Sequence, residues 1–135
     1  MGTIVSQNGD REAADNAFRE VLDQFRKLPD ESISSETAAC SINAANMLAI
    51  DLIGRGEADQ AGQVWVESCT RWLAADPALI DRLVKVLGPL DVLFQNYRIH
   101  LMNQGRRDEA DAMVAEYEAL RARIPGVKEP LPGLD

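Results

Sequence analysis

Apolar residues recur every three or four positions along most of the chain, which is the spacing of an α-helix that buries one face. Residues 10–28 show this clearly, because the opposite face is charged and the apolar positions form one stripe: Ala14, Phe18, Val21, Leu22, Phe25 and Leu28. Proline follows at position 29, and its ring cannot continue a helix. The pattern predicts a helix of about five turns that ends near Pro29.

The next stripe predicts a second helix with small side chains. Its apolar positions are Ala38, Ile42, Ala45, Leu48, Ala49 and Leu52. Ser32 or Ser34 can cap the first turn, and Gly54 and Gly56 mark the end. Small side chains allow neighbouring backbones to approach closely. We therefore expect this helix to be the central and most buried one.

Three further helical segments are expected: residues 58–75, 78–103 and 107–123. Gly88 and Pro89 interrupt the middle segment, and such a pair kinks or ends a helix. We therefore expect it to be kinked, or divided into residues 78–87 and 90–103.

The same layout occurs three times at a nearly constant spacing. Each unit has a glycine before a helix, an alanine within it and a proline after it: Gly9, Ala14 and Pro29; Gly56, Ala61 and Pro77; Gly105, Ala110 and Pro125. The prolines lie 48 residues apart, and the glycines and alanines lie 47 and 49 apart. Such self-similarity is typical of stacked helical repeats, in which one unit cannot bury its apolar face alone.

The units resemble the tetratricopeptide repeat, whose pattern is W-x2-L-G-x2-Y, then A-x3-F, then P, on two antiparallel helices. The second unit matches through Ala45, Leu48, Ala49, Leu52, Ala61, Trp65 and Pro77, and the third through Phe94, Tyr97, Arg98, Leu101, Ala110, Val114 and Pro125. The first unit matches only the second half, through Ala14, Phe18 and Pro29. The resemblance covers roughly residues 9–125.

Two features depart from the pattern. The period is 48 residues rather than 34, and the surplus of 14 is close to four helical turns. We therefore expect the helices to be longer, with their apolar faces unrotated. Arg98 stands where the pattern has a small residue.

The resemblance implies an all-α fold, in which antiparallel helical hairpins stack as a short tetratricopeptide-like α-solenoid of about five helices in residues 10–125. We expect residues 1–9 to be a flexible lead-in. Residues 126–135 are rich in proline and glycine and are expected to form a flexible tail.

Tetratricopeptide-like proteins bind other proteins, usually as extended peptides in a concave groove lined by the first helix of each pair. The resemblance therefore implies a partner-binding face made of Asn43, Asn46, Ile50 and Ile53 in the second unit and Val92, Gln95, Ile99, Met102 and Asn103 in the third. The lysine and asparagine clamp of the chaperone-adaptor branch is absent from these positions. In the alternative interpretation the same residues are permanently buried, in a homodimer or in the end cap of a larger helical array.

Composition narrows the class of partner. The net charge is -8, with 22 acidic and 14 basic residues, so the overall field repels nucleic acid and anionic lipid. No apolar run reaches the ~20 residues of a membrane span. Cys40 and Cys69 are too few for a disulfide scaffold, which favours a cytoplasmic location. We expect a cytoplasmic protein that binds a protein or peptide, not nucleic acid or a membrane.

The sequence offers little catalytic chemistry. His100 is the only histidine, so any histidine-dependent metal site or catalytic relay would rest on it. Its neighbours Ile99 and Leu101 are aliphatic, and we expect a partly exposed helix residue instead. Phosphate-binding, dinucleotide-binding and H-E-x-x-H zinc motifs are absent from the sequence. We expect no enzyme activity, no cofactor and no metal.

Overall fold

A computed structural model describes residues 2–83 and 86–124, and their side chains from residue 12 on. Within that part, the chain forms six α-helices and one short 3-10 helix, without a strand. The elements are α1 (Gly2–Arg26), η1 (Asp30–Ser32), α2 (Ser35–Gly54), α3 (Ala58–Leu73), α4 (Pro77–Arg82), α5 (Leu87–Asn103) and α6 (Arg107–Ala122). The expected all-α fold is confirmed.

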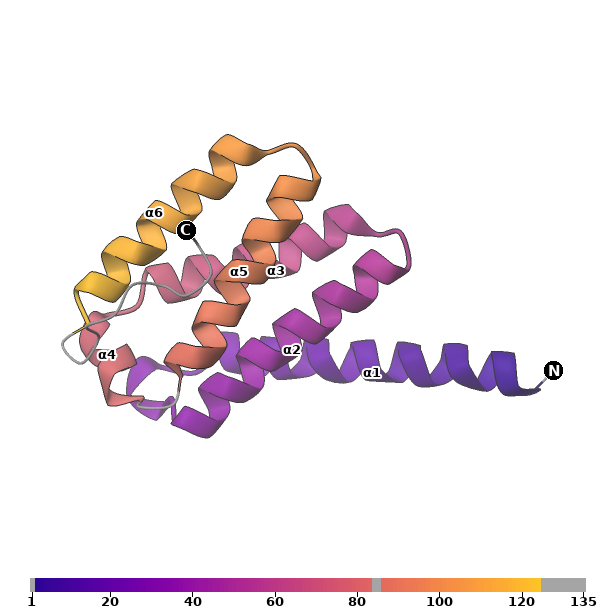
Figure 1. The fold of residues 1–135 in the computed structure, drawn as a ribbon. Coiled ribbons are helices and arrows are strands. Elements are labelled where there is room, and N and C mark those ends of the chain that lie inside the picture. The colour runs from indigo at the N-terminus through magenta and orange to yellow at the C-terminus, as the bar shows by residue number, and fades with distance from the viewer. Residues whose placement is uncertain (1, 84–85, 125–135) are drawn as a thin grey trace.

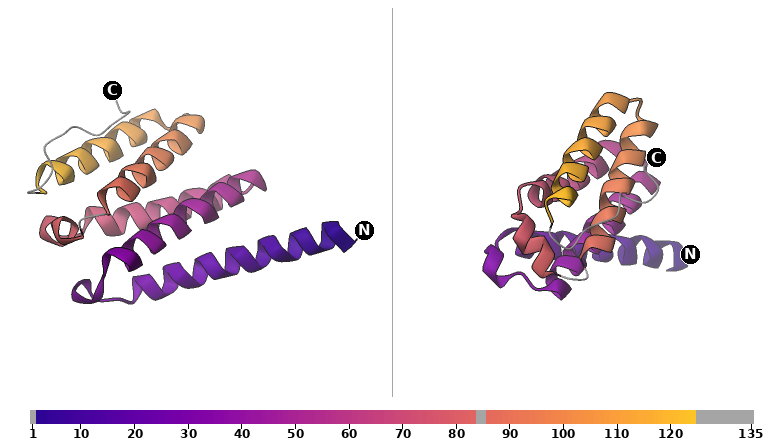
Figure 2. Two further views of the ribbon diagram at one scale, coloured as in Figure 1. Left: turned by 60° about the horizontal axis from the view of Figure 1, so that its bottom comes forward. Right: turned by 60° about the vertical axis from the view of Figure 1, so that its left-hand side comes forward.

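The helices follow one another across the molecule in chain order, with α1 at one end and α6 at the other (Figure 1, Figure 2). Helix α2 packs against α1, α3 and α5, and both α3 and α5 also pack against α6. Nine of the 20 residues of α2 are buried, compared with five of 16 in α3 and six of 17 in α5. The prediction that α2 would be the most buried helix is thus confirmed.

Two hairpins, α2–α3 and α5–α6, are closed by the same type of turn. Gly56 and Gly105 follow the C-terminal residues of α2 and α5 with φ values of 80° and 73°. In each turn the amide after the glycine donates to a carbonyl five residues earlier, at 2.8 Å from Glu57 to Leu52 and 2.9 Å from Arg106 to Leu101. This is the Schellman arrangement, in which glycine adopts the left-handed conformation at low cost. The repeat seen in the sequence therefore corresponds to a repeated turn.

Helix α1 differs from the expectation at its beginning. It starts at Gly2, so residues 2–9, for which a flexible lead-in was expected, belong to the helix, and Gly9 lies within the helix instead of in a turn. No proline occurs before position 29, and a single glycine inside a helix costs only about 1 kcal/mol. The first half of α1 extends beyond the other helices (Figure 1).

The alanines of the three units also differ. Ala61 in α3 and Ala110 in α6 are fully buried, each within a closed hairpin. Ala14 is exposed, and Asp15 is the buried residue beside it. Helix α1 packs against α2 without a glycine turn of this type among the described residues, and its face that carries Ala14 is exposed.

The surplus length is divided between the helices and a connection. The hairpins span residues 35–73 and 87–122, which are 39 and 36 residues, so each hairpin alone is longer than a whole 34-residue repeat with its connection. Residues between them include the short α4, which begins with Pro77 and is capped by Asp76. The helices therefore take up part of the surplus of 14 residues, as expected, and the connection that contains α4 takes up the rest.

The segment expected at residues 78–103 is divided, but not at Gly88 and Pro89. Helix α4 ends at Arg82 and α5 begins at Leu87, so both residues lie in the first turn of α5. Amides in a first turn have no acceptor within the helix, so proline removes no hydrogen bond there. Pro89 thus begins a helix that it was expected to interrupt.

A buried polar group joins α5 to α6. Asp91 accepts hydrogen bonds from the hydroxyl of Tyr117 and from Nε of Arg121, the latter at 3.1 Å. Tyr117 stacks on Phe94 with ring centroids 3.9 Å apart. Burial, followed by the hydrogen bond and charge of Asp91, raises the pKa of Tyr117 and keeps its hydroxyl protonated. Arg98 is only half-buried and does not prevent this packing.

The two turns lead to a prediction about three glycines. Replacing Gly56 or Gly105 by alanine should lower the free energy of unfolding by about 1 kcal/mol, because alanine is strained at positive φ. Gly54→Ala is the matched control: a Cβ there meets nothing within 4 Å, and Gly54 lies inside α2. That change should be neutral or stabilising in urea unfolding. Equal effects of Gly54→Ala and Gly56→Ala would contradict the assignment of the turn.

Candidate partner-binding groove

Exposed apolar side chains gather on α2 and α5. Among the described residues six large hydrophobic side chains are exposed: Met47, Ile50 and Ile53 on α2, Val92 and Ile99 on α5, and Val66 on α3. Ile50 and Ile99 are each 52% exposed. Five of the six lie on α2 and α5, which pack side by side, and Ile50, Ile53 and Ile99 line one hollow between these helices. We call Met47, Ile50, Ile53, Val92 and Ile99 the α2–α5 face.

A hollow lies within this face near the C-terminal ends of both helices. Its volume is about 220 Å³, and its walls are Ile50, Ile53, Trp65, Asn96, Ile99, His100 and Asn103. Neither an acidic side chain nor lysine or arginine lines it. We call this hollow the groove pocket. Its chemistry is apolar, with amide groups at the edge.

The predicted binding residues have four different placements. Ile50, Ile53, Ile99 and Asn103 line the groove pocket. Asn43 is exposed on α2, while Gln95 and Met102 are half-buried, with Met102 packed against the core. Asn46 is buried.

Asn46 connects three helices from inside the fold. Its Oδ1 accepts a hydrogen bond from Nε1 of Trp65 on α3 at 3.0 Å and another from Nδ2 of Asn96 on α5 at 3.3 Å. A buried indole N–H requires an acceptor, and Asn46 supplies it. Asn46 therefore positions Trp65 beneath the groove pocket and is not on the surface where the sequence placed it.

His100 is also buried, although we expected partial exposure. Its side chain is 5% exposed, and its ring lies 5.1 Å from that of Trp65. A Cβ on Gly62 of α3 would lie 3.2 Å from Nε2 of His100, so glycine permits the close approach. Burial, assisted by the charge of Arg106 and opposed by that of Asp59, lowers the pKa of His100. The imidazole at the wall of the groove pocket is therefore neutral near pH 7.

Sequence reasoning missed Asn96 and His100 as wall residues, and it assigned Trp65 to the core alone. A signal was present for His100, because it lies three residues after Tyr97 and next to Leu101, which are both buried. The position of a residue on a helix shows whether it lies near the core-facing side. The neighbouring helices decide how wide the buried face is, and therefore whether a residue at its margin is buried.

A larger cleft lies between α1 and α3, with a volume of about 490 Å³. Leu22, Phe25, Val64 and Trp72 are among its walls. Its buried hydroxyl already has a partner, because Ser41 donates to the carbonyl of Ala38 at 2.8 Å. The cleft has no row of exposed apolar side chains like that of the α2–α5 face, so we regard the face as the better candidate.

Other groups give little chemistry. Cys40 is exposed and Cys69 is buried, and both are free thiols. Burial raises the pKa of Cys69, so its thiol stays protonated. In the described part of the chain, no three His, Cys, Asp or Glu residues are grouped so that they could hold a metal ion.

Helix α2 is apolar on more than its buried side. It is the one described helix long and apolar enough to cross a membrane by length and composition, and half of the qualifying window is buried in the fold. A core helix passes the same test. The additional hydropathy comes from Met47, Ile50 and Ile53, which belong to the α2–α5 face.

Comparisons of the chain with family models, with curated proteins and with solved structures found no match. The fold and the groove therefore provide the basis for a functional proposal.

The burial of His100 leads to a prediction about pH. Because its pKa is lowered in the folded state, the unfolded chain takes up a proton first as the pH falls below about 6.5. Stability should therefore fall between about pH 7 and pH 5, and His100→Gln should reduce that slope. Urea unfolding of the wild type and of His100→Gln at several pH values measures this dependence of stability on pH. Parallel stability curves over this range would show that His100 is not the group responsible.

Proposed function

We propose that this chain is a tetratricopeptide-like protein-interaction module that binds an uncharged, aliphatic peptide segment of a partner protein on the α2–α5 face. The single observation that carries the proposal is the concentration of exposed apolar side chains on two adjacent helices. Scattered exposed hydrophobic residues are ordinary, whereas several on two adjacent helices, three of them around one hollow, are typical of an interaction site.

The class of partner is supported by the charges of the site. The walls of the groove pocket carry no acidic, lysine or arginine side chain, and burial keeps His100 neutral. A charged group placed there would lose water without gaining an opposite charge. An aliphatic side chain has no charge whose hydration would be lost in the pocket. The exposed amide of Asn103 at the edge can form a hydrogen bond with a peptide backbone.

The size of the site supports a peptide rather than a whole small molecule. Pockets that enclose drug-sized ligands have volumes of roughly 300–1,000 Å³. The groove pocket, at about 220 Å³, is smaller and open along the face. It suits one side chain of a longer segment, whose remainder would lie across Met47 and Val92.

The proposal predicts which variants lose binding. Peptides selected from a random display library by the purified chain should be rich in aliphatic residues and poor in charged ones. Ile50→Lys combined with Ile99→Lys should weaken a selected peptide at least tenfold, because both contacts become charged (about 1.4 kcal/mol or more). Fluorescence anisotropy with a labelled peptide measures the dissociation constant.

Val66→Lys is the matched control, since Val66 is an exposed hydrophobic residue on α3 outside the α2–α5 face. It should leave the affinity unchanged, and circular dichroism should show equal helicity in all variants. Unchanged peptide binding in the double variant would exclude the face as the site. Sedimentation separates the alternative function: a wild-type dimer that dissociates in the double variant would assign the face to self-association.

A further inference from the structure

Helix α1 is attached to the rest of the fold at two separate places. Among its described side chains, those of residues 12–26, only Asp15 and Phe25 are buried. Phe18 and Leu22 between them are partly buried against the core. A helix with so few buried contacts is the element that separates most easily from the fold.

Phe25 holds the C-terminal end of α1. Its ring stacks on Trp72 with centroids 5.8 Å apart, and the guanidinium of Arg71 lies 4.4 Å from the ring centre. Arg71 also donates to the backbone carbonyls of Arg26 and Leu28, each at 3.1 Å. Clefts of about 490 and 460 Å³ lie beside Phe25, so this end is fixed by one ring and by the hydrogen bonds of Arg71, with open space next to the ring.

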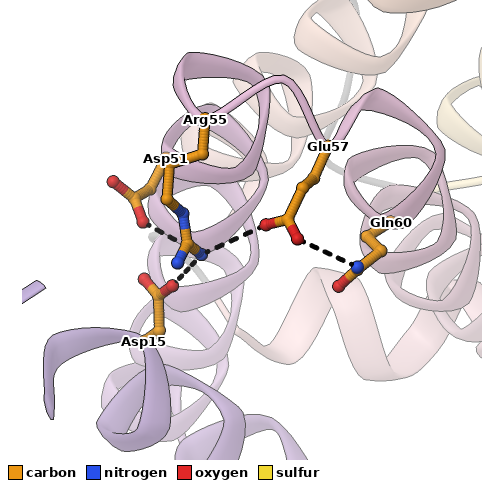
Figure 3. A network of polar contacts seen from close by, with 5 residues as sticks. All are labelled: Asp15, Asp51, Arg55, Glu57 and Gln60. Carbon is orange, nitrogen blue, oxygen red and sulfur yellow. Dashed lines mark hydrogen bonds and ion pairs between the residues drawn. The ribbon is translucent and has the colours of Figure 1, made fainter. Parts of the chain in front are cut away.

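Asp15 holds α1 at the other place, near the α2–α3 turn (Figure 3). Arg55 forms an ion pair with Asp15 and lies 3.4 Å from Asp51 and 3.7 Å from Glu57. One guanidinium thus faces three carboxylates from α1, α2 and the start of α3. We call Asp15, Asp51 and Arg55 the Asp15 cluster.

When Asp15 and Asp51 are both ionised, the two carboxylates repel one another and share the guanidinium of Arg55. Asp15 is only 5% exposed, and its Oδ1 is buried without a hydrogen-bond donor. Ionised carboxylates can only accept, so Asp15 and Asp51 cannot bond to one another in that state. A proton on Asp15 turns it into a donor to Asp51 and removes the repulsion between them. The geometry therefore has a place for one proton.

The pKa of Asp15 agrees with this geometry. Burial raises it, and so do the hydrogen bond to Asp51 and the charge of Asp51. The charges of Arg55 and Arg19 act in the opposite direction without cancelling the effect. These are the charged groups that face Asp15 from α2 and from α1 itself, and Glu57 reaches the cluster only through Arg55.

We propose that the docking of α1 on α2 is controlled by pH through a proton held between Asp15 and Asp51. With the proton bound, the carboxyl pair and Arg55 fasten α1 to the α2–α3 turn. Without it, two adjacent carboxylates share one guanidinium and α1 docks more weakly. Detachment would uncover Trp72, on which Phe25 stacks. This proposal does not depend on the binding of a peptide to the α2–α5 face.

The sign of the effect follows from proton linkage. A docked state with a raised pKa binds more protons than a detached state in which Asp15 titrates near its ordinary value. Docking is therefore strongest below that value and weakens as the pH rises through the raised pKa of Asp15. At a pH above the pKa values of Asp15 in both the docked and the detached state, docking is weaker than at low pH. The factor is ten for each unit by which docking raises the pKa.

Hydrogen exchange of the full chain tests the proposal. Amide protection in α1, corrected for intrinsic exchange rates, should fall as the pH rises from about 4 to 7, while protection in α2 should not fall over the same range. Asp15→Asn should abolish this dependence, because the asparagine amide donates to Asp51 at every pH. Asp51→Asn removes only the repulsion, so its pH dependence should be shallower than that of the wild type.

Glu12→Gln is the matched control, since Glu12 is an exposed acidic residue one turn earlier on α1. It should exchange like the wild type at every pH. Constant protection of α1 in the wild type, or the same pH dependence in Asp15→Asn as in the wild type, would overturn the proposal. So would a parallel loss of protection in α2, which would indicate global unfolding instead of detachment.

Discussion

The close packing of α2 against three other helices is the constraint on which the rest of the structure depends. Ala38, Ala45 and Ala49 are fully buried on α2, so their short side chains let α1, α3 and α5 approach its backbone. Protein interiors are packed at close to crystalline density, so a larger side chain at these places would push a neighbour away. The separation of α2 and α5 sets the shape of the groove pocket.

This packing also explains why polar side chains occur inside the fold. Trp65 fills the space between α2, α3 and α5, and its indole N–H lies away from water. Asn46 satisfies that requirement through its amide oxygen, which also accepts a hydrogen bond from Asn96. A buried amide with defined partners restricts the relative positions of three helices more strongly than an apolar contact does. The apolar face can therefore stay open while the layer beneath it is fixed.

Helix α1 is held in a different way. The two hairpins close with glycine turns and buried alanines, whereas α1 relies on one aromatic ring and one buried aspartate. Ionic attachment depends on the protonation of neighbouring groups, which hydrophobic attachment does not. The two ends of the molecule therefore differ in their attachment: α6 belongs to a hairpin closed by a glycine turn and is also held by Asp91, whereas α1 has no such turn.

Most of the secondary structure followed from the sequence, because periodicity and turn chemistry act locally. The stripe in residues 38–52 predicts α2, and Gly56 and Gly105 predict the turns, since only glycine adopts positive φ without strain. The apolar members of the candidate face, Ile50, Ile53 and Ile99, could be found in the same way. Tertiary packing decided the rest. Asn46, His100 and Asp15 lie at the margins of helix faces, where burial depends on how near the next helix comes, and no local pattern contains that distance.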